Sequence, residues 1–289
     1  MRIRNLENPH LDRFEISDIQ GSEATDFFDT NGYLIVSNVL SKDTTERFKL
    51  DVKRVINAQL HRANEDSLDE KSELILTEGI KKLELIDHDN VAEIYDTIFG
   101  MSSFLRICGD LNIENSILSL LRVEPKKPLY GFTNRCRIDP PRDERRTYGW
   151  HQEVFYTIPN GRYIQTWAPL ICDTTIQNGT IEIAIGSHVE GIANQSWIES
   201  PGKATQILID NDVISKYPQI SVEMKVGEMM FFSGFLGHRS GTNVSDEVRY
   251  SLVGMYHDID HKPFHAPKID FEFRKMSPKK YFESIFEKR

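Results

Sequence analysis

The sequence predicts a mainly β core of the sandwich, jelly-roll or barrel kind, preceded by a helical N-terminal part. Through about residue 110, apolar residues recur at helical spacing, as at Phe48, Val52 and Leu60. From Ile117 onward, short segments alternate between apolar and polar residues. Gly, Pro, Asn and Asp separate these segments, which is typical of short strands joined by turns.

Local signals place the individual elements. A short helix is expected over 24–30, where the turn signal Asn31-Gly32 ends it, and an apolar, β-branched strand over 33–39. Ser41 is a typical N-cap for the next helix, and further helical patterns occupy residues 72–110. The strands expected in the core cover residues 117–123, 130–138, 163–170, 180–185, 220–226, 229–232 and 249–256, and a short closing helix is expected over 281–286.

Composition limits the classes of function. The chain has 289 residues, of which 39% are hydrophobic and 27% charged, which is ordinary for a globular protein that buries its own core. The formal net charge of −9 argues against nucleic acid and anionic lipid as partners. Three scattered cysteines without CxxC spacing indicate a reducing compartment. With no signal-peptide pattern and no apolar run long enough to span a bilayer, we expect a cytoplasmic protein without a membrane partner.

Domain organisation is expected to be simple, because no linker rich in Pro, Gly or Ser divides the chain. We expect a single domain over 1–289. It consists of a helical part over about 1–110, a β core over about 117–257 and a C-terminal extension over 258–289. The charged segment 139–149 is either a lid over the site or a plain solvated loop.

The motif Trp150-His151-Gln152-Glu153 suggests a metal site. In an extended segment, residues two apart point to the same face, so His151 and Glu153 would project together and Gln152 away from them. His238, after an apolar strand, is the best third ligand, although seven other histidines remain. Two His and one carboxylate leave open positions on iron(II) for oxygen chemistry, but catalytic zinc uses the same ligand set.

Arg249 lies 11 residues after His238 (249 − 238), at the start of an alternating strand. An inward arginine in a mostly apolar barrel needs an anion to offset its burial. Its planar fork matches a carboxylate in bidentate fashion. A dicarboxylate cosubstrate bound to the metal at one end could present its other carboxylate here.

These motifs, in this order, resemble the phytanoyl-CoA dioxygenase-like group of iron(II)/2-oxoglutarate oxygenases. The resemblance covers roughly residues 25–256 and is specific as an ordered set rather than in any one part. Its segments are the F-x-x-x-G-Y-x-x-V-like stretch Phe27 to Val39, Trp150 to Glu153, Trp167 to Leu170, Asn178-Gly179-Thr180, Ile185-Gly186-Ser187-His188, Gly227-Glu228, His238-x-Ser240-x-x-Asn243 and Arg249.

The resemblance implies a double-stranded β-helix, a cupin-like jelly roll, with iron(II) held by His151, Glu153 and His238. It implies that Arg249 and Ser240 bind the distal carboxylate of 2-oxoglutarate. The remaining assignments are Trp167 in the cosubstrate pocket, Arg137 on cosubstrate or substrate, and His188 in a structural turn. The family more often has Asp where this chain has Glu153, whose longer side chain still supplies an anionic oxygen.

The implied reaction is hydroxylation of a C–H bond of a small-molecule substrate by O2, with release of succinate and CO2. Desaturation and ring formation remain open outcomes. Two other classes also remain: a non-redox cupin-like metal enzyme, such as an isomerase or hydrolase, and a catalytically inactive ligand-binding relative. Several arginines flank the presumed mouth and either attract an anionic substrate or are balanced by acidic neighbours. They are Arg135, Arg137, Arg142, Arg145 and Arg146.

Overall fold

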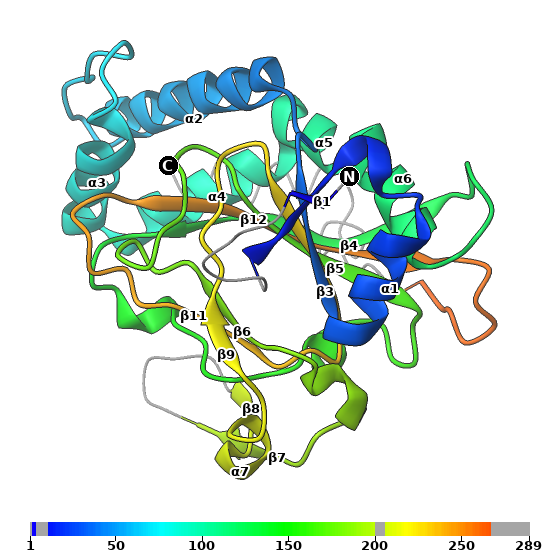
Figure 1. Ribbon diagram of the computed structural model, residues 1–289. Coiled ribbons are helices and arrows are strands. Elements are labelled where there is room, and N and C mark those ends of the chain that lie inside the picture. The colour runs from blue at the N-terminus through cyan, green and yellow to red at the C-terminus, as the bar shows by residue number, and fades with distance from the viewer. Residues whose placement is uncertain (1, 4–10, 200–205, 267–289) are drawn as a thin grey trace, which may run out of the picture.

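A seven-stranded sheet crosses the middle of the molecule (Figure 1). The computed structural model describes residues 2–3, 11–199 and 206–266, so the closing helix expected over 281–286 lies outside it. All described neighbours in this sheet are antiparallel except β2 and β3. In spatial order the strands are β1 (Arg2–Ile3), β2 (Arg13–Glu15), β3 (Tyr33–Ser37), β10 (Met229–Ser233), β5 (Tyr163–Pro169), β12 (Arg249–Asp258) and β4 (Leu129–Asp139).

A smaller sheet and a two-stranded ribbon lie below it in Figure 1. The small sheet has the order β11 (His238–Ser240), β6 (Ile181–Ala184) and β9 (Gln219–Ser221). The ribbon pairs β7 (Gln195–Ile198) with β8 (Gln206–Ile209), and α7 (Asn211–Ile214) follows it. A single bridge joins His151 to His238, so the predicted metal motif runs beside β11.

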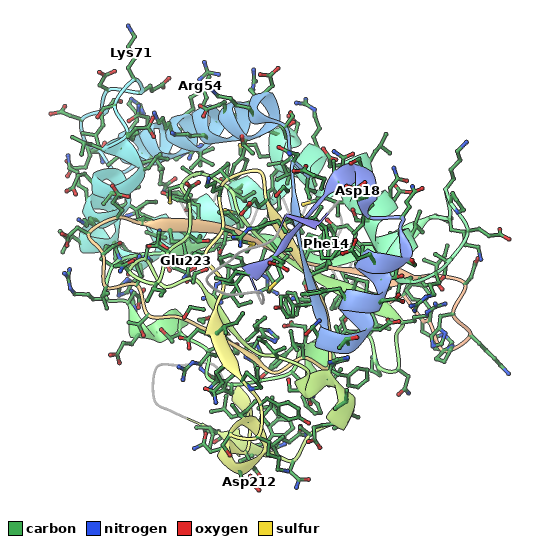
Figure 2. All side chains as sticks on the ribbon, viewed as in Figure 1. Phe14, Asp18, Arg54, Lys71, Asp212 and Glu223 are labelled. Atoms are coloured by element: carbon green, nitrogen blue, oxygen red, sulfur yellow. The ribbon has the colours of Figure 1, made fainter. Side chains whose placement is uncertain are left out.

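The N-terminal part contributes most of the helices. The predicted N-cap is present, since the Ser41 hydroxyl accepts a hydrogen bond from the Thr44 N–H at 3.2 Å. Figure 2 shows Arg54 and Lys71 extending from the outer edge of this part, while Phe14 is almost fully buried in the centre. The helices are α1 (Ser22–Asn31), α2 (Lys42–Arg62), the π-helical turn η3 (Ile75–Gly79), α3 (Ile80–Ile86), α4 (His88–Gly100), α5 (Ser102–Cys108) and α6 (Leu111–Leu120).

One predicted strand, over 117–123, is wrong. Residues up to Leu120 belong to helix α6, which Asp110 caps by accepting a hydrogen bond from the Asn112 N–H at 2.8 Å. Ile113 and Ile117 are buried on one face of this helix, four residues apart. The prediction for 220–226 is also too long, because strand β9 ends at Ser221. The protein is therefore a mixed α/β fold with a sheet-rich core rather than a mainly β protein.

Strand β3 joins the N-terminal part to the core. Tyr33, Leu34, Ile35 and Val36 are all fully buried, on both faces of the strand. A strand covered on both faces forms a continuous apolar run rather than an alternating one. Because β3 hydrogen-bonds to β10, the N-terminal part and the β core share one sheet and one hydrophobic core.

Two further expectations concern compartment and cysteines. The described part of the chain has no helix of the length and apolarity needed to cross a bilayer. Cys108, Cys136 and Cys172 are free thiols. Burial raises the pKa of all three, so these thiols pack as small apolar groups rather than as thiolates.

Candidate metal and cosubstrate site

A pocket lies between the seven-stranded sheet and the small sheet. One wall comes from β4, β5, β10 and β12, and the other comes from β6 and β11. It encloses about 140 Å³ of space accessible to water-sized molecules. Since one water needs roughly 10–15 Å³ by this measure, the pocket admits a small organic molecule as well as an ion.

Three candidate ligands converge in this pocket. The ligating atoms of His151, Glu153 and His238 all lie within 4.8 Å of one another. Glu153 Oε2 is 3.5 Å from His238 Nε2 and 3.9 Å from His151 Nε2. Both histidines are buried, at 8% and 5% exposure. The structure thus brings together two imidazole nitrogens and one carboxylate from segments far apart in sequence.

Main-chain hydrogen bonds hold the two histidines side by side. The His151 N–H donates to the His238 carbonyl at 2.9 Å, and the His238 N–H donates back at 3.1 Å. Their ring centroids are 4.1 Å apart. The Glu153 N–H donates to the Gly234 carbonyl at 3.1 Å, which ties the third residue to the turn that precedes β11.

The imidazole rings are oriented for metal binding. Nδ1 of His151 lies 2.8 Å from the Gly149 carbonyl, and Nδ1 of His238 lies 2.9 Å from the Leu236 carbonyl. A carbonyl partner requires a proton on Nδ1, so in the neutral ring Nε2 carries the lone pair. Both Nε2 atoms face Glu153, and this is the arrangement that a metal-binding histidine with a second hydrogen-bond partner adopts.

The protonation states of His151 and Glu153 also favour binding of a cation. Burial, followed by the neighbouring His238, lowers the pKa of His151 to about 3. Burial acts to raise the pKa of Glu153, but the neighbouring His238 and His151 side chains outweigh it and lower that pKa. At neutral pH the pocket therefore presents a neutral His151 imidazole and a Glu153 carboxylate, the forms that bind metals.

Gln152 points away from the pocket, as the alternation predicted, and is fully buried. Its amide donates to the carbonyls of Gly191 at 2.7 Å and Phe235 at 2.6 Å, and its oxygen accepts from the Ala193 N–H at 3.0 Å. This glutamine fixes the segment between two candidate ligands, a role that sequence reasoning did not assign to it.

The Arg249 end of the pocket differs from expectation, because an anion of the protein itself already pairs with this arginine. Asp139 Oδ2 is 2.8 Å from Arg249 Nη2, and Asp139 Oδ1 is 2.8 Å from Arg137 Nη2. Asp139 was assigned to the charged loop 139–149, yet it is the last residue of β4 and is buried. Burial acts to raise the pKa of Asp139, but Arg137 and Arg249 outweigh it and lower that pKa to about 2.

Two guanidinium groups and one carboxylate leave one net positive charge at this end. Arg249 Nη1 donates to the Asn178 carbonyl at 3.2 Å, and Arg137 Nη1 donates to the Ser240 hydroxyl at 3.3 Å. Arg249 Nε is buried without a hydrogen-bond partner among the described residues. The Trp167 ring lies 6.0 Å from the Arg249 guanidinium carbon and also lines the pocket. This end can accept one more carboxylate.

The predicted turn at Asn178 and Gly179 shapes the backbone beside the pocket, and Gly179 lines it. Gly179 has φ of +77°, a left-handed conformation that favours glycine, and the Asn178 side chain accepts from the Thr175 N–H at 2.8 Å. His188 Nε2 lies 3.0 Å from the Asp29 carbonyl and does not line the pocket. The sequence did not point to five other polar lining residues, which are Thr133, Tyr148, Tyr156, Gln165 and Arg239.

Known proteins resemble this chain in sequence and in fold. The profile of the phytanoyl-CoA dioxygenase (PhyH) family matches residues 28–251. A relative, 1-deoxypentalenic acid 11-beta-hydroxylase of Streptomyces arenae, is 26% identical over 234 residues, which are 77% of this chain and 75% of the relative.

Two solved structures share the fold. The non-heme alpha ketoglutarate dependent epimerase SnoN from nogalamycin biosynthesis has a TM-score of 0.56 at 16% identity, covering 88% of this chain and 92% of that one. EctD from S. alaskensis with bound Fe has a TM-score of 0.56 at 18% identity, covering 89% and 85%. At these identities the likeness concerns the fold alone.

Proposed function

The chain belongs to the phytanoyl-CoA dioxygenase family, and on that premise we propose that it hydroxylates a C–H bond of a small molecule. It is an enzyme of the non-haem iron(II)- and 2-oxoglutarate-dependent class. The observation that carries the proposal is the convergence of His151, Glu153 and His238 in one buried cluster. The relative from Streptomyces arenae is named as a hydroxylase of 1-deoxypentalenic acid, which is consistent with a small-molecule substrate.

His151, Glu153 and His238 would hold the iron, because two imidazoles and one carboxylate form the facial set that leaves open positions on the metal. When bound, iron supplies the activation of O2 at the expense of 2-oxoglutarate. In the overall reaction, R–H, O2 and 2-oxoglutarate give R–OH, succinate and CO2. Glu153 and a neutral His151 enter the reaction already in metal-binding form.

The other residues of the pocket orient 2-oxoglutarate and the substrate. Arg249, supported by Ser240 and Arg137, would bind the distal carboxylate of 2-oxoglutarate, and Trp167 would close one side of that subsite. The net positive charge and the unpartnered Arg249 Nε support this assignment. Apolar side chains such as Phe232 and Met255 exclude water from the rest of the pocket.

The proposal includes the architecture. The two sheets that face the pocket form a double-stranded β-helix, and residues 1–289 act as one oxygenase domain. Support comes from the placement of β3 within the large sheet, next to β10 of the core. The family match begins at residue 28, within the helical part, and so includes part of it.

The test is an anaerobic visible spectrum of the protein with iron(II) and 2-oxoglutarate. We expect a weak metal-to-ligand charge-transfer band that is lost in His151→Ala and diminished in Arg249→Ala. His61→Ala is the matched control, because His61 is exposed on α2 and does not line the pocket; it should keep the band. Succinate release then identifies substrates.

A folded, iron-loaded wild-type protein without the band would contradict the proposal. It would favour a non-redox metal enzyme or an inactive ligand-binding relative. Formation of succinate without a hydroxylated product would instead point to desaturation, ring formation or epimerisation at the same site.

A further inference from the structure

One arginine of the pocket differs from the others in forming no ion pair at contact distance among the described residues. Four arginines line the pocket, and three of them are paired with a carboxylate. Asp139 serves both Arg137 and Arg249, while Arg239 pairs with Glu182 at 2.7 Å and lies over the Trp150 ring. The fourth, Arg135, is exposed, and its hydrogen bond among the described residues goes to the Thr133 carbonyl at 3.4 Å.

The arginines of the neighbouring loop do not share this property. Arg142 pairs with Asp246 at 3.3 Å, and Arg145 pairs with Asp143 at 2.9 Å and also with Glu84. Neither of them lines the pocket. Among the described side chains, Arg142 and Arg145 are therefore balanced, whereas Arg135 lines the pocket without an ion pair.

Unpartnered polar atoms lie on the same wall as Arg135. Thr133 Oγ1 and Gln165 Oε1 are both buried and have no hydrogen-bond partner among the described residues, and both residues line the pocket. Gln165 is only 1% exposed. Since buried polar groups are nearly always hydrogen-bonded, two unpartnered groups within the wall of one pocket point to a missing polar ligand.

A β-bulge places these groups together. The pairing of β4 with β12 shifts between Val253 and Met255, so that Thr133 and Asn134 lie opposite a single residue. Thr133 has φ of +51°, a left-handed conformation that is costly for a β-branched residue. Asn134 Oδ1 accepts the Met255 N–H at 3.1 Å, which replaces the lost ladder hydrogen bond. Bulges often redirect side chains beside active sites.

This polar wall is separate from the Arg249 end. Arg249 lies opposite Asp139, and Arg135 lies opposite Val253, four residues farther along β12. At 3.3 Å per residue the two ends are roughly 13 Å apart along the sheet. A cosubstrate that reaches from Arg249 to the metal held by His151 and His238 therefore leaves Arg135 available to a second molecule.

We infer that Arg135, Thr133 and Gln165 form the subsite for an anionic group of the substrate, and that the substrate is a small carboxylic acid. The guanidinium of Arg135 binds the carboxylate, the Thr133 hydroxyl donates a second hydrogen bond to it, and Gln165 Oε1 accepts a hydrogen bond from a donor group beside that carboxylate. The apolar part of the substrate then packs on Val253 and Met255. This inference rests on the proposed function, because it concerns the second molecule in the same pocket.

The test uses ligand-observed NMR on protein loaded with zinc(II) and 2-oxoglutarate, which cannot turn over. The probes are hexanoic, cyclohexanecarboxylic and 1-adamantanecarboxylic acids, each with its methyl ester. We expect acids to bind and esters not to bind. Arg135→Gln should weaken acid binding at least tenfold and Arg135→Lys less, since a charged hydrogen bond is lost in the first and retained in the second.

Arg142→Gln is the control, because Arg142 is an exposed arginine outside the pocket, and it should leave acid binding unchanged. None of the three variants should change the iron(II)–2-oxoglutarate charge-transfer band. Absence of that band in the wild type would contradict the proposed function. A normal band with no acid bound, equal binding of acids and esters, or unchanged binding in Arg135→Gln would overturn the substrate assignment alone.

Discussion

Replacing Asp139 by asparagine should destabilise the protein in a pH-dependent way. The carboxylate of Asp139 is the shared partner of Arg137 and Arg249 and is only 6% exposed. Asparagine has nearly the same shape, so the variant removes the charge and keeps the packing. Two guanidinium groups then face each other across a neutral amide inside the protein.

The magnitude follows from the pKa of the Asp139 carboxyl, which is 3.8 in the ordinary state and about 2 in the folded protein. This difference corresponds to roughly 2 kcal/mol of stability at neutral pH. Leaving buried cations without their partner raises the cost, and the loss of one member of a buried ion pair typically costs about 3–5 kcal/mol. We therefore expect Asp139→Asn to lose between about 2 and 5 kcal/mol at pH 7.

The sign of the pH dependence is fixed by the lowered pKa. A carboxyl group whose folded pKa is depressed contributes its full stability above pH 3.8 and loses it as the pH falls towards 2. Roughly half of the contribution should remain at pH 3. The difference between wild type and Asp139→Asn should accordingly be constant from pH 7 to pH 5 and shrink below pH 4.

Urea unfolding of both proteins across this pH range measures the difference. Asp246→Asn is the matched control, because Asp246 pairs with Arg142 but its side chain is 87% exposed. An exposed pair contributes under about 1 kcal/mol. The reasoning is refuted if Asp139→Asn unfolds within about 0.5 kcal/mol of wild type at pH 7, or if the difference persists unchanged at pH 3.

Three further predictions test the site and its support. Gln152→Leu should lower the free energy of unfolding by about 2–4 kcal/mol in urea titrations, because it leaves two carbonyls and an N–H without partners. Gly234→Ala places a Cβ 1.9 Å from the Tyr163 hydroxyl and should lower the free energy of unfolding by about 1–3 kcal/mol. Gly100→Ala is the control, because a Cβ there has no atom within 4 Å, and it should not destabilise the protein. Thermal melts of the two variants measure the difference. Arg249→Leu should raise the Kd for 2-oxoglutarate roughly 30-fold or more, as measured by titrating the charge-transfer band. Its affinity for iron should stay within a factor of about three of the wild type, as measured by metal titration.

Local signals in the sequence predicted much of the architecture. Ser41 identified the start of α2, and the period-two alternation from Tyr130 to Ile138 and from Arg249 to Tyr256 identified two strands that line the pocket. The same alternation placed Gln152 on the face opposite its neighbours. These predictions succeed because each depends on residues close together in the chain.

The remaining features depend on contacts between distant segments. The run from Ile117 to Leu121 has the composition of a buried strand, and only its position after the Asp110 cap makes it a helix. Asp139 reads as the first residue of a charged loop, because its partner Arg249 lies 110 residues away. The bulge at Thr133 has no sequence signature of its own, and it was therefore not predicted.

The backbone pairing of His151 with His238 bears on how the metal enters and leaves. Two reciprocal main-chain hydrogen bonds set the separation of these residues, so this spacing does not depend on a bound cation. Little conformational entropy remains to be lost when a metal is captured, which favours loading after folding rather than during it. The protein should then fold stably without metal. The identity of the metal it binds should depend on which metals are available and on the preference of the two imidazoles and the carboxylate, rather than on the folding pathway.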